Sequence, residues 1–237
     1  MGRTGWSQND ILYEDAEILV CRKHAGIAVQ SARIGQMDME SALKSYLQGG
    51  FLGIVQRLDQ PVEGILVFGK TPQATAELNR QHQNGKMKKK YLAVYRRDLS
   101  GGENEKGCTG QNAENALICL EDVLLKDGRS NTSRVVRNGT PQGKKAVLFY
   151  RILQEKEDAG LAEVILQTGR HHQIRVQMAH HGMPLWGDGK YNPQITEEEQ
   201  GAAIGLCAYK LEFLHPKKGK KLQFQIEPEG SVFGRFK

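Results

Sequence analysis

The chain has 237 residues, enough for one large domain with a substantial core or for a main lobe with a small appendage. Its hydrophobic content of 39% excludes a disordered chain, and no stretch approaches the run of about 18 apolar residues that a membrane span requires. The 33 Lys and Arg residues outnumber the 27 Asp and Glu residues, so the formal charge of +6 favours a polyanionic partner without proving one.

Cysteine usage and the N-terminus bear on the compartment. The four cysteines are too widely spaced for a CxxC metal knuckle and too few for a disulfide scaffold: Cys21, Cys108, Cys119 and Cys207. The opening "MGRTGWSQND" contains no apolar signal segment. We therefore expect reduced, mostly buried thiols in a cytoplasmic protein that has no membrane association.

The first half of the chain predicts alternating strands and short helices. "ILYED" and "EILVCRK" are typical of two strands, and "AGIAVQ" of a further extended segment. Apolar spacing predicts a helix that begins after Asp38 as N-cap and ends at Gly49. The buried strand "GILVFGK" leads into a second helix with Thr71 as N-cap, Pro72 in its first turn and Gly85 at its end. "KKKYLAVYRR" then alternates as a strand.

The second half predicts hairpins around one helix. The Gly- and Asn-rich residues 98–115 indicate a long irregular loop. Strands follow in "ALICLEDVLL", "TSRVVR", "KKAVLFYRIL" and "AEVILQT", then a helix in "HHQIRVQMAHHG" and a final hairpin that turns at "PKKG". No regular βαβ repeat is present, so the sequence predicts an α+β fold with a mixed, mostly antiparallel sheet and flanking helices.

Three stretches carry residues suited to chemistry. In "VQRLDQPVEGILV", Asp59 either caps the turn before Pro61 or is a reactive carboxylate that a nearby cation keeps ionised. In "GKMKKKYLAVY", the lysines are either a solvated charge run or hold phosphates while Tyr91 stacks on a base. From the residues alone, both alternatives stay open.

The third stretch is "TGRHHQIRVQMAHHG". Its Gly-Arg turn at the start of a helix places Arg170 and backbone N–H groups where an anion can bind, and Arg175 lies about one turn further on. The four histidines, His171, His172, His180 and His181, lack the spacing of three or four residues and the neighbouring acid of a metal site. We therefore predict no metal.

The order of these stretches resembles the RluA-like family of RNA pseudouridine synthases. "QRLDQPVEGILVFGKT" is similar to the family's H-R-L-D-x-x-x-S-G-L-L-L-x-A-K-T segment, and "KKKYLAVY" to its K-x-Y-x-A element. "TGRHHQIRVQMAHHGMPLWGDGKY" is similar to T-G-R-x-H-Q-I-R-x-H-x-x-x-x-G-x-P-x-x-G-D-x-x-Y. The likeness begins at a Lys-x-x-Gly turn in "ILYEDAEILVCRKHAGIAVQ" and spans roughly residues 11–228.

The resemblance implies a fold with a central active-site cleft and an isomerisation of uridine to pseudouridine that needs no cofactor. It implies that Asp59 is the nucleophile, attacking either the sugar or the base, that Tyr91 lies against the flipped uracil, and that Arg175 pairs with the aspartate. It also implies that Arg57 fills the space left by the flipped nucleotide. We predict that RNA is bound through Arg57, Lys88, Lys89, Lys90, Arg170, His172 and Gln173.

Departures from the family pattern concern selectivity more than chemistry. Gln56 replaces a His, "QPVEG" replaces a tract that carries Asp, Thr and Ser, and His24 replaces a Pro. Further along, His171 replaces a Thr, Gln177 a His and Asn192 a Gly. An alternative that the departures favour is a catalytically silent RNA-binding or RNA-chaperone protein of the same fold.

The resemblance also sets the expected organisation. We predict an N-terminal tail over residues 1–10, one catalytic domain over 11–230 without a separate N-terminal RNA-binding domain, and a C-terminal tail over 231–237. The expected partner is structured rRNA or tRNA, and the expected state is a monomer.

Overall fold

A computed structural model describes residues 5–31, 35–97, 117–197, 199, 201 and 203–237. These residues form two compact units, each of which is described by itself. The first unit runs up to Lys90 and includes Cys207–Gly230, and the second comprises Tyr91–Leu206 with Ser231–Lys237. The predicted irregular loop over residues 98–115 lies outside the described residues, as does Cys108.

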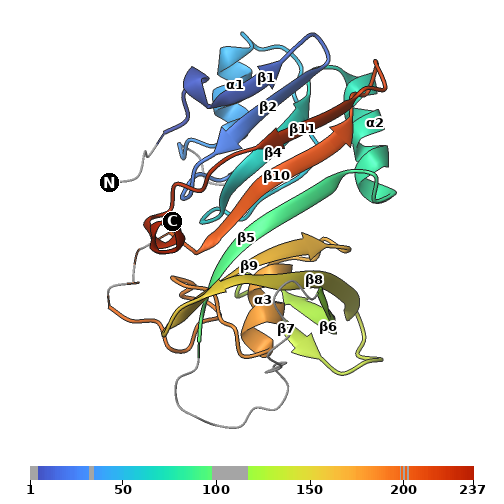
Figure 1. The fold of residues 1–237 in the computed structure, drawn as a ribbon. Coiled ribbons are helices and arrows are strands. Elements are labelled where there is room, and N and C mark those ends of the chain that lie inside the picture. The colour runs from blue at the N-terminus through green and yellow to red at the C-terminus, as the bar shows by residue number, and fades with distance from the viewer. Residues whose placement is uncertain (1–4, 32–34, 98–116, 198, 200, 202) are drawn as a thin grey trace. The chain divides into compact units, whose positions relative to one another are not determined.

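Unit 1 is a mixed sheet with two helices (Figure 1). Its strands have the order β1-β2-β4-β10, with β11 paired to β10 and β3 to β4, and only the β4–β10 pair is parallel among them. Its elements are η1 (Gln8–Asp10), β1 (Ile11–Glu14), β2 (Ile18–Lys23), α1 (Met39–Tyr46), β3 (Gly53–Ile54), β4 (Glu63–Gly69), α2 (Pro72–Gln83), β10 (Leu206–Leu214) and β11 (Lys221–Gln225).

Both helices of unit 1 begin where their caps predict. The Asp38 side chain accepts a hydrogen bond from the Ser41 N–H, and the Thr71 hydroxyl accepts one from the Ala74 N–H. Side-chain caps of this kind satisfy amide groups that the first helical turn leaves open. The apolar faces of β2, β4 and α1 share one core, which includes Leu19, Leu43 and Phe68.

The parallel pair explains a glycine in the loop-to-strand junction. Gly64 has a φ of +149°, and a Cβ there would lie 2.7 Å from the backbone nitrogen of Ala208. Strand β10 can approach β4 this closely only because residue 64 has no side chain. The close approach fixes where β4 begins, directly after the loop that carries Asp59.

Unit 2 is a sheet whose β9–β8, β8–β6 and β6–β7 pairs are antiparallel, with one largely buried helix. Its strand order is β5-β9-β8-β6-β7. Its elements are β5 (Lys88–Arg96, which starts in unit 1), β6 (Ile118–Asp127), β7 (Thr132–Val136), β8 (Lys144–Glu155), β9 (Ala159–Leu166), α3 (Gln173–His180) and η2 (Ser231–Phe236). Figure 1 shows α3 lying beside the strands of this sheet, and Val176 of α3 packs on Leu124 and Ala146.

The predicted mixed, mostly antiparallel α+β fold is confirmed, with three local differences. "AGIAVQ" forms no named strand and contributes an isolated parallel bridge between Ala28 and Asp38. Both predicted tails carry a 3-10 helix, at residues 8–10 and 231–236. Helix α3 begins after His172, which has a left-handed φ of 52° and makes no side-chain cap.

Two further expectations concern the burial of the cysteines and the absence of a membrane span. Cys21 and Cys207 are buried, as predicted, whereas Cys119 is exposed. Within the described ranges, no helix has the length and apolarity needed to cross a membrane.

Candidate active site

Asp59 lies in the loop of residues 55–62, between β3 and β4. Its side chain is half-buried, and its backbone carbonyl accepts the Val62 N–H at 3.0 Å to close a turn around Pro61. The turn uses the backbone carbonyl of Asp59. The same residue can therefore close the turn before Pro61 and also carry a reactive carboxylate.

The loop is held on its other side by the Lys-x-x-Gly turn. The Gly26 N–H donates to the Gln60 carbonyl at 2.8 Å, and the Gln60 amide donates back to the Gly26 carbonyl at 3.0 Å. The Lys23 ammonium donates to the same Gln60 carbonyl at 3.0 Å. Three hydrogen bonds therefore fix the residue that directly follows Asp59.

Lys23 is a fully buried cation, and we did not predict it as a site residue. Its ammonium also donates to the carbonyls of His24 at 3.0 Å and Ile27 at 2.6 Å. Burial lowers the pKa of Lys23 to about 7, and the negative charges of Asp59 and Glu63 oppose that shift. Within unit 1, Lys23 is thus a cation whose charge acts on Asp59. The Lys-x-x-Gly motif was the sequence signal that could have identified it.

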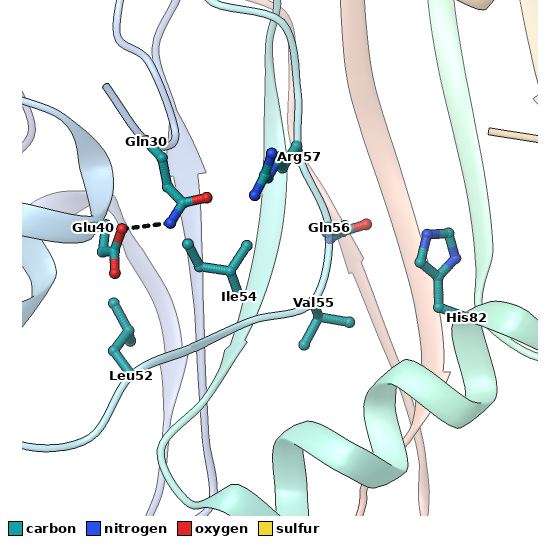
Figure 2. Close-up of a pocket in the computed structure, with 8 residues that line it drawn as sticks. All are labelled: Gln30, Glu40, Leu52, Ile54, Val55, Gln56, Arg57 and His82. Carbon is teal, nitrogen blue, oxygen red and sulfur yellow. Dashed lines mark hydrogen bonds between the residues drawn. The ribbon is translucent and has the colours of Figure 1, made fainter. Parts of the chain in front are cut away.

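The Arg57 side chain is exposed on the loop, two residues before Asp59. It lines a pocket of about 440 Å³ that lies wholly within unit 1 (Figure 2). Gln56, the neighbouring residue at which the sequence departs from the family, lines the same pocket and is 5% exposed.

The lysine run is divided by the alternation of strand β5. Successive side chains of a strand point to opposite faces, so Lys88 and Lys90 share one face, whereas Lys89 shares the other with Tyr91. Lys88 is exposed, while burial lowers the pKa of Lys89 to about 8. Tyr91 is 5% exposed and is the first residue of unit 2.

Arg175 is held on α3 by a carboxylate of its own unit. Its Nε and Nη2 donate to the two oxygens of Asp188 at 2.8 and 2.7 Å, and both side chains are buried. The guanidinium carbon also lies 5.1 Å from the centre of the Tyr191 ring. Asp188 and Tyr191 belong to the G-D-x-x-Y motif, and we did not predict them as site residues. The two hydrogen bonds to Asp188 fix the orientation of the Arg175 guanidinium plane, and the Tyr191 ring contacts the same group.

The Tyr191 hydroxyl connects this pair to the other motif residues. It accepts the Ser133 N–H at 2.8 Å and lies 2.7 Å from Nδ1 of His172. Because the hydroxyl accepts from a backbone amide, its own proton is available for the histidine nitrogen. His172 and Arg175 are thus brought together around one tyrosine.

The remaining predicted RNA contacts differ in exposure. Arg170 is exposed and donates from Nε to the Lys145 carbonyl at 2.9 Å. Gln173 is 3% exposed, and its oxygen accepts from the Thr168 hydroxyl and the Arg170 N–H. Its amide nitrogen donates to Val147 and Gln177. Gln173 therefore fixes the Gly-Arg turn in front of α3.

Two departures from the family pattern meet at the C-terminal segment of unit 1. Both carboxylate oxygens of Glu63 accept the Glu229 N–H, at 3.0 and 3.1 Å, and one accepts the Gly230 N–H at 3.0 Å. The two ring nitrogens of His24 lie 2.8 Å from carboxylate oxygens of Asp10 and Glu229. Glu63 and His24 therefore attach residues 229–230 to the sheet.

The predicted site residues are divided between the units. Unit 1 holds Asp59, Arg57, Lys88, Lys89 and Lys90, and unit 2 holds Tyr91, Arg170, His172, Gln173 and Arg175. Each unit presents a fixed charged group: the Asp59 loop with Lys23 in one, and Arg175 with Asp188 in the other.

Comparison with known proteins now bears on this arrangement. Residues 17–180 match the family model described as RNA pseudouridylate synthase, which is more than half of the chain. The chain belongs to this family.

Curated relatives agree with the family. An uncharacterised RNA pseudouridine synthase of Bacillus subtilis is 32% identical over 226 residues, which cover 91% of this chain and 68% of the relative. Ribosomal large subunit pseudouridine synthase C of Pasteurella multocida is 32% identical over 94% of this chain and 66% of its own length. Ribosomal large subunit pseudouridine synthase D of Zymomonas mobilis is 31% identical over 92% and 68%. The chain thus spans about two thirds of each relative.

A solved structure agrees with the fold. Human RNA pseudouridylate synthase domain containing 4 superposes with a TM-score of 0.71 at 19% identity, over 93% of this chain and 89% of that chain. The predicted RluA-like family, the pseudouridine synthase fold and the enzyme class, an isomerase, are confirmed.

Proposed function

We propose that this protein isomerises uridine to pseudouridine in structured rRNA or tRNA, with Asp59 as the nucleophile. The observation that supports the proposal most strongly is the attachment of the Asp59 loop to Lys23 and Gly26 through Gln60. A nucleophile must be held in one geometry to react. The names of the relatives, which refer to the large ribosomal subunit, favour rRNA.

The proposed reaction breaks the bond from the sugar C1′ to uracil N1 and forms a bond from C1′ to uracil C5. The C5 proton leaves, and N1 gains a proton, so the atoms and electrons balance without an oxidant or a reductant. Asp59 attacks either the sugar or the ring and is released when the new bond has formed. Tyr91, whose side chain is buried, lies against the uracil and acts as the base in its phenolate form, which takes up the C5 proton and becomes the neutral phenol. Arg175 pairs with the Asp59 carboxylate.

The uridine must leave the RNA stack before it can react, which costs a few kcal/mol. The exposed Arg57 side chain is proposed to occupy the space that the base vacates. Lys88, Lys90 and Arg170 are exposed or half-buried cations suited to phosphate contacts. His172 and Gln173 are buried, and we propose that they shape the RNA-binding surface together with the half-buried Lys89.

Release of tritium from RNA labelled at uracil C5 tests the proposal. Wild-type protein should release tritium from total rRNA or tRNA, and an Asp59→Ala variant should bind RNA and release none. Asp127→Ala, at an exposed turn of unit 2, is the matched control and should behave as wild type. Absence of release by wild type on both RNAs, with RNA binding retained, would instead favour a catalytically silent RNA-binding protein.

A further inference from the structure

His171 connects the β6–β7 hairpin with the start of α3. It is one of the positions at which the sequence departs from the family pattern, where a Thr is usual. Its Nδ1 lies 2.9 Å from the Ser133 hydroxyl, and its Nε2 lies 3.1 Å from the side-chain oxygen of Asn131. Figure 1 shows β7, which carries Ser133, beside α3. The two ring nitrogens point in different directions, so a single Thr hydroxyl could not make both contacts.

Two residues beside these contacts have a left-handed backbone. Asn131 has a φ of 50°, and His172 has a φ of 52°. A left-handed φ is uncommon for any residue except Gly and costs free energy, so it persists only where surrounding contacts impose it. His171 precedes His172 in the chain and contacts the Asn131 side chain, so one ring touches both of these positions.

The His171 ring also packs on the His172 ring. The two ring centroids are 3.7 Å apart and the planes are inclined by 24°, which is a stacked arrangement. The His172 ring has a second neighbour in Tyr191, whose ring centroid lies 5.6 Å away and whose hydroxyl is 2.7 Å from Nδ1. His172, which is 8% exposed, is thus held by His171 and by Tyr191.

The partners of both rings fix where their protons lie. The side-chain oxygen of Asn131 can only accept, so Nε2 of His171 carries a proton and the Ser133 hydroxyl donates to Nδ1. The Tyr191 hydroxyl accepts the Ser133 N–H and donates to Nδ1 of His172. The proton of a neutral His172 ring is therefore on Nε2. Each ring has one tautomer and one orientation.

We propose that His171 is a positioning residue that acts through His172 on the Tyr191 ring. The inference rests on the proposed function, in which Arg175 takes part in the reaction. The guanidinium carbon of Arg175 lies 5.1 Å from the centre of the Tyr191 ring. Without the His171 ring, His172 can turn, and Tyr191 loses a fixed partner. Asp188 still holds the guanidinium with two hydrogen bonds, so activity should fall without being abolished.

Tritium release at saturating RNA, together with RNA binding, separates positioning from direct contact with RNA. His171→Ala should lower the release rate about 10-fold and change the Kd for rRNA transcripts by less than about 2-fold. Ser133→Ala removes one partner of the ring and should lower the rate about 3-fold, whereas Ser133→Thr keeps the hydroxyl and should restore it. His180→Ala, at the exposed end of the same helix, is the matched control and should behave as wild type.

Nitrogen NMR of protein with isotope-labelled histidine gives a readout that does not depend on activity. In wild type, His172 should show one tautomer with its proton on Nε2, and in His171→Ala it should exchange between both tautomers. The spectrum of His172→Gln assigns the signals.

An unchanged release rate in His171→Ala would overturn the inference. A Kd that rises about 10-fold at an unchanged rate would also overturn it, because His171 would then be an RNA contact. If wild type releases no tritium while His171→Ala changes the His172 tautomer, the positioning by His171 is supported and the proposed function is overturned.

Discussion

Replacement of the buried Lys23 by Met tests how the Asp59 loop is held. The ammonium donates three hydrogen bonds to carbonyl groups, each worth about 1.5 to 3 kcal/mol because the donor is charged. Against this, the fall of its pKa from 10.5 to about 7 corresponds to a cost of about 5 kcal/mol for burying the charge, at about 1.36 kcal/mol per pKa unit. The difference predicts that Lys23→Met loses between about 0 and 4 kcal/mol of stability at pH 7.

The difference in the free energy of unfolding between wild type and Lys23→Met depends on pH. Because the folded state lowers the pKa of Lys23, the unfolded chain binds more protons between about pH 7 and pH 10. The free energy of unfolding that Lys23 contributes therefore rises with pH in this window and falls again as pH drops toward 7. Met cannot titrate, so wild type should gain about 2 kcal/mol over Lys23→Met between pH 7 and pH 9.

Urea unfolding followed by circular dichroism at pH 7, 8 and 9 measures this difference. Lys221→Met, which removes an exposed lysine paired with Glu212 on the neighbouring strand, is the control and should show no such trend. Tritium release by Lys23→Met should fall about 10- to 100-fold, because the residue next to Asp59 loses one of its attachments. Parallel stability curves together with unchanged tritium release would refute the reasoning.

Three further substitutions have defined outcomes. Asp188→Asn leaves the buried Arg175 charge without its partner, so urea unfolding should show a loss of about 3 to 5 kcal/mol, whereas Glu121→Gln in an exposed pair should cost under about 1 kcal/mol. Tyr191→Phe removes a hydroxyl with two buried partners and should lower stability by about 1 to 3 kcal/mol in the same assay. Glu63→Gln weakens the attachment of residues 229–230, so limited proteolysis should cut the C-terminal segment faster than in wild type; an unchanged cleavage rate would contradict that role.

The sequence predicted the elements whose signals are local. Helix α2 is an example, since Thr71 caps it, Pro72 starts it and Gly85 follows it with a φ of +65°. The start of α3 had no such signal, because His172 enters the left-handed region without a side-chain cap. Its geometry depends on the distant Tyr191 hydroxyl, which no local pattern reveals.

In the candidate active site, too, contacts between residues far apart in the chain could not be predicted. Asp59 and Arg175 could be identified from motifs, but their partners within each unit, Lys23 and Asp188, lie 36 and 13 residues away in the chain. The Lys-x-x-Gly motif marks the position of Lys23, but it does not reveal that the ammonium is buried against three carbonyl acceptors. The pairing depends on how the strands fold back on one another.

The departures from the family pattern separate into two groups on structural grounds. Glu63 and His24 contact the C-terminal segment, so their identities are explained by the attachment of that segment. Gln56 lines the pocket and has an unpaired amide nitrogen.

The central claim is that Asp59 is the nucleophile of an RNA isomerisation, and nucleotide-resolution mapping of pseudouridine tests it most directly. Unmodified rRNA transcripts would be incubated with wild type, Asp59→Asn or Asp127→Asn. The account predicts new pseudouridine at defined positions with wild type and with Asp127→Asn, and none with Asp59→Asn. The same pseudouridines formed by Asp59→Asn would contradict it.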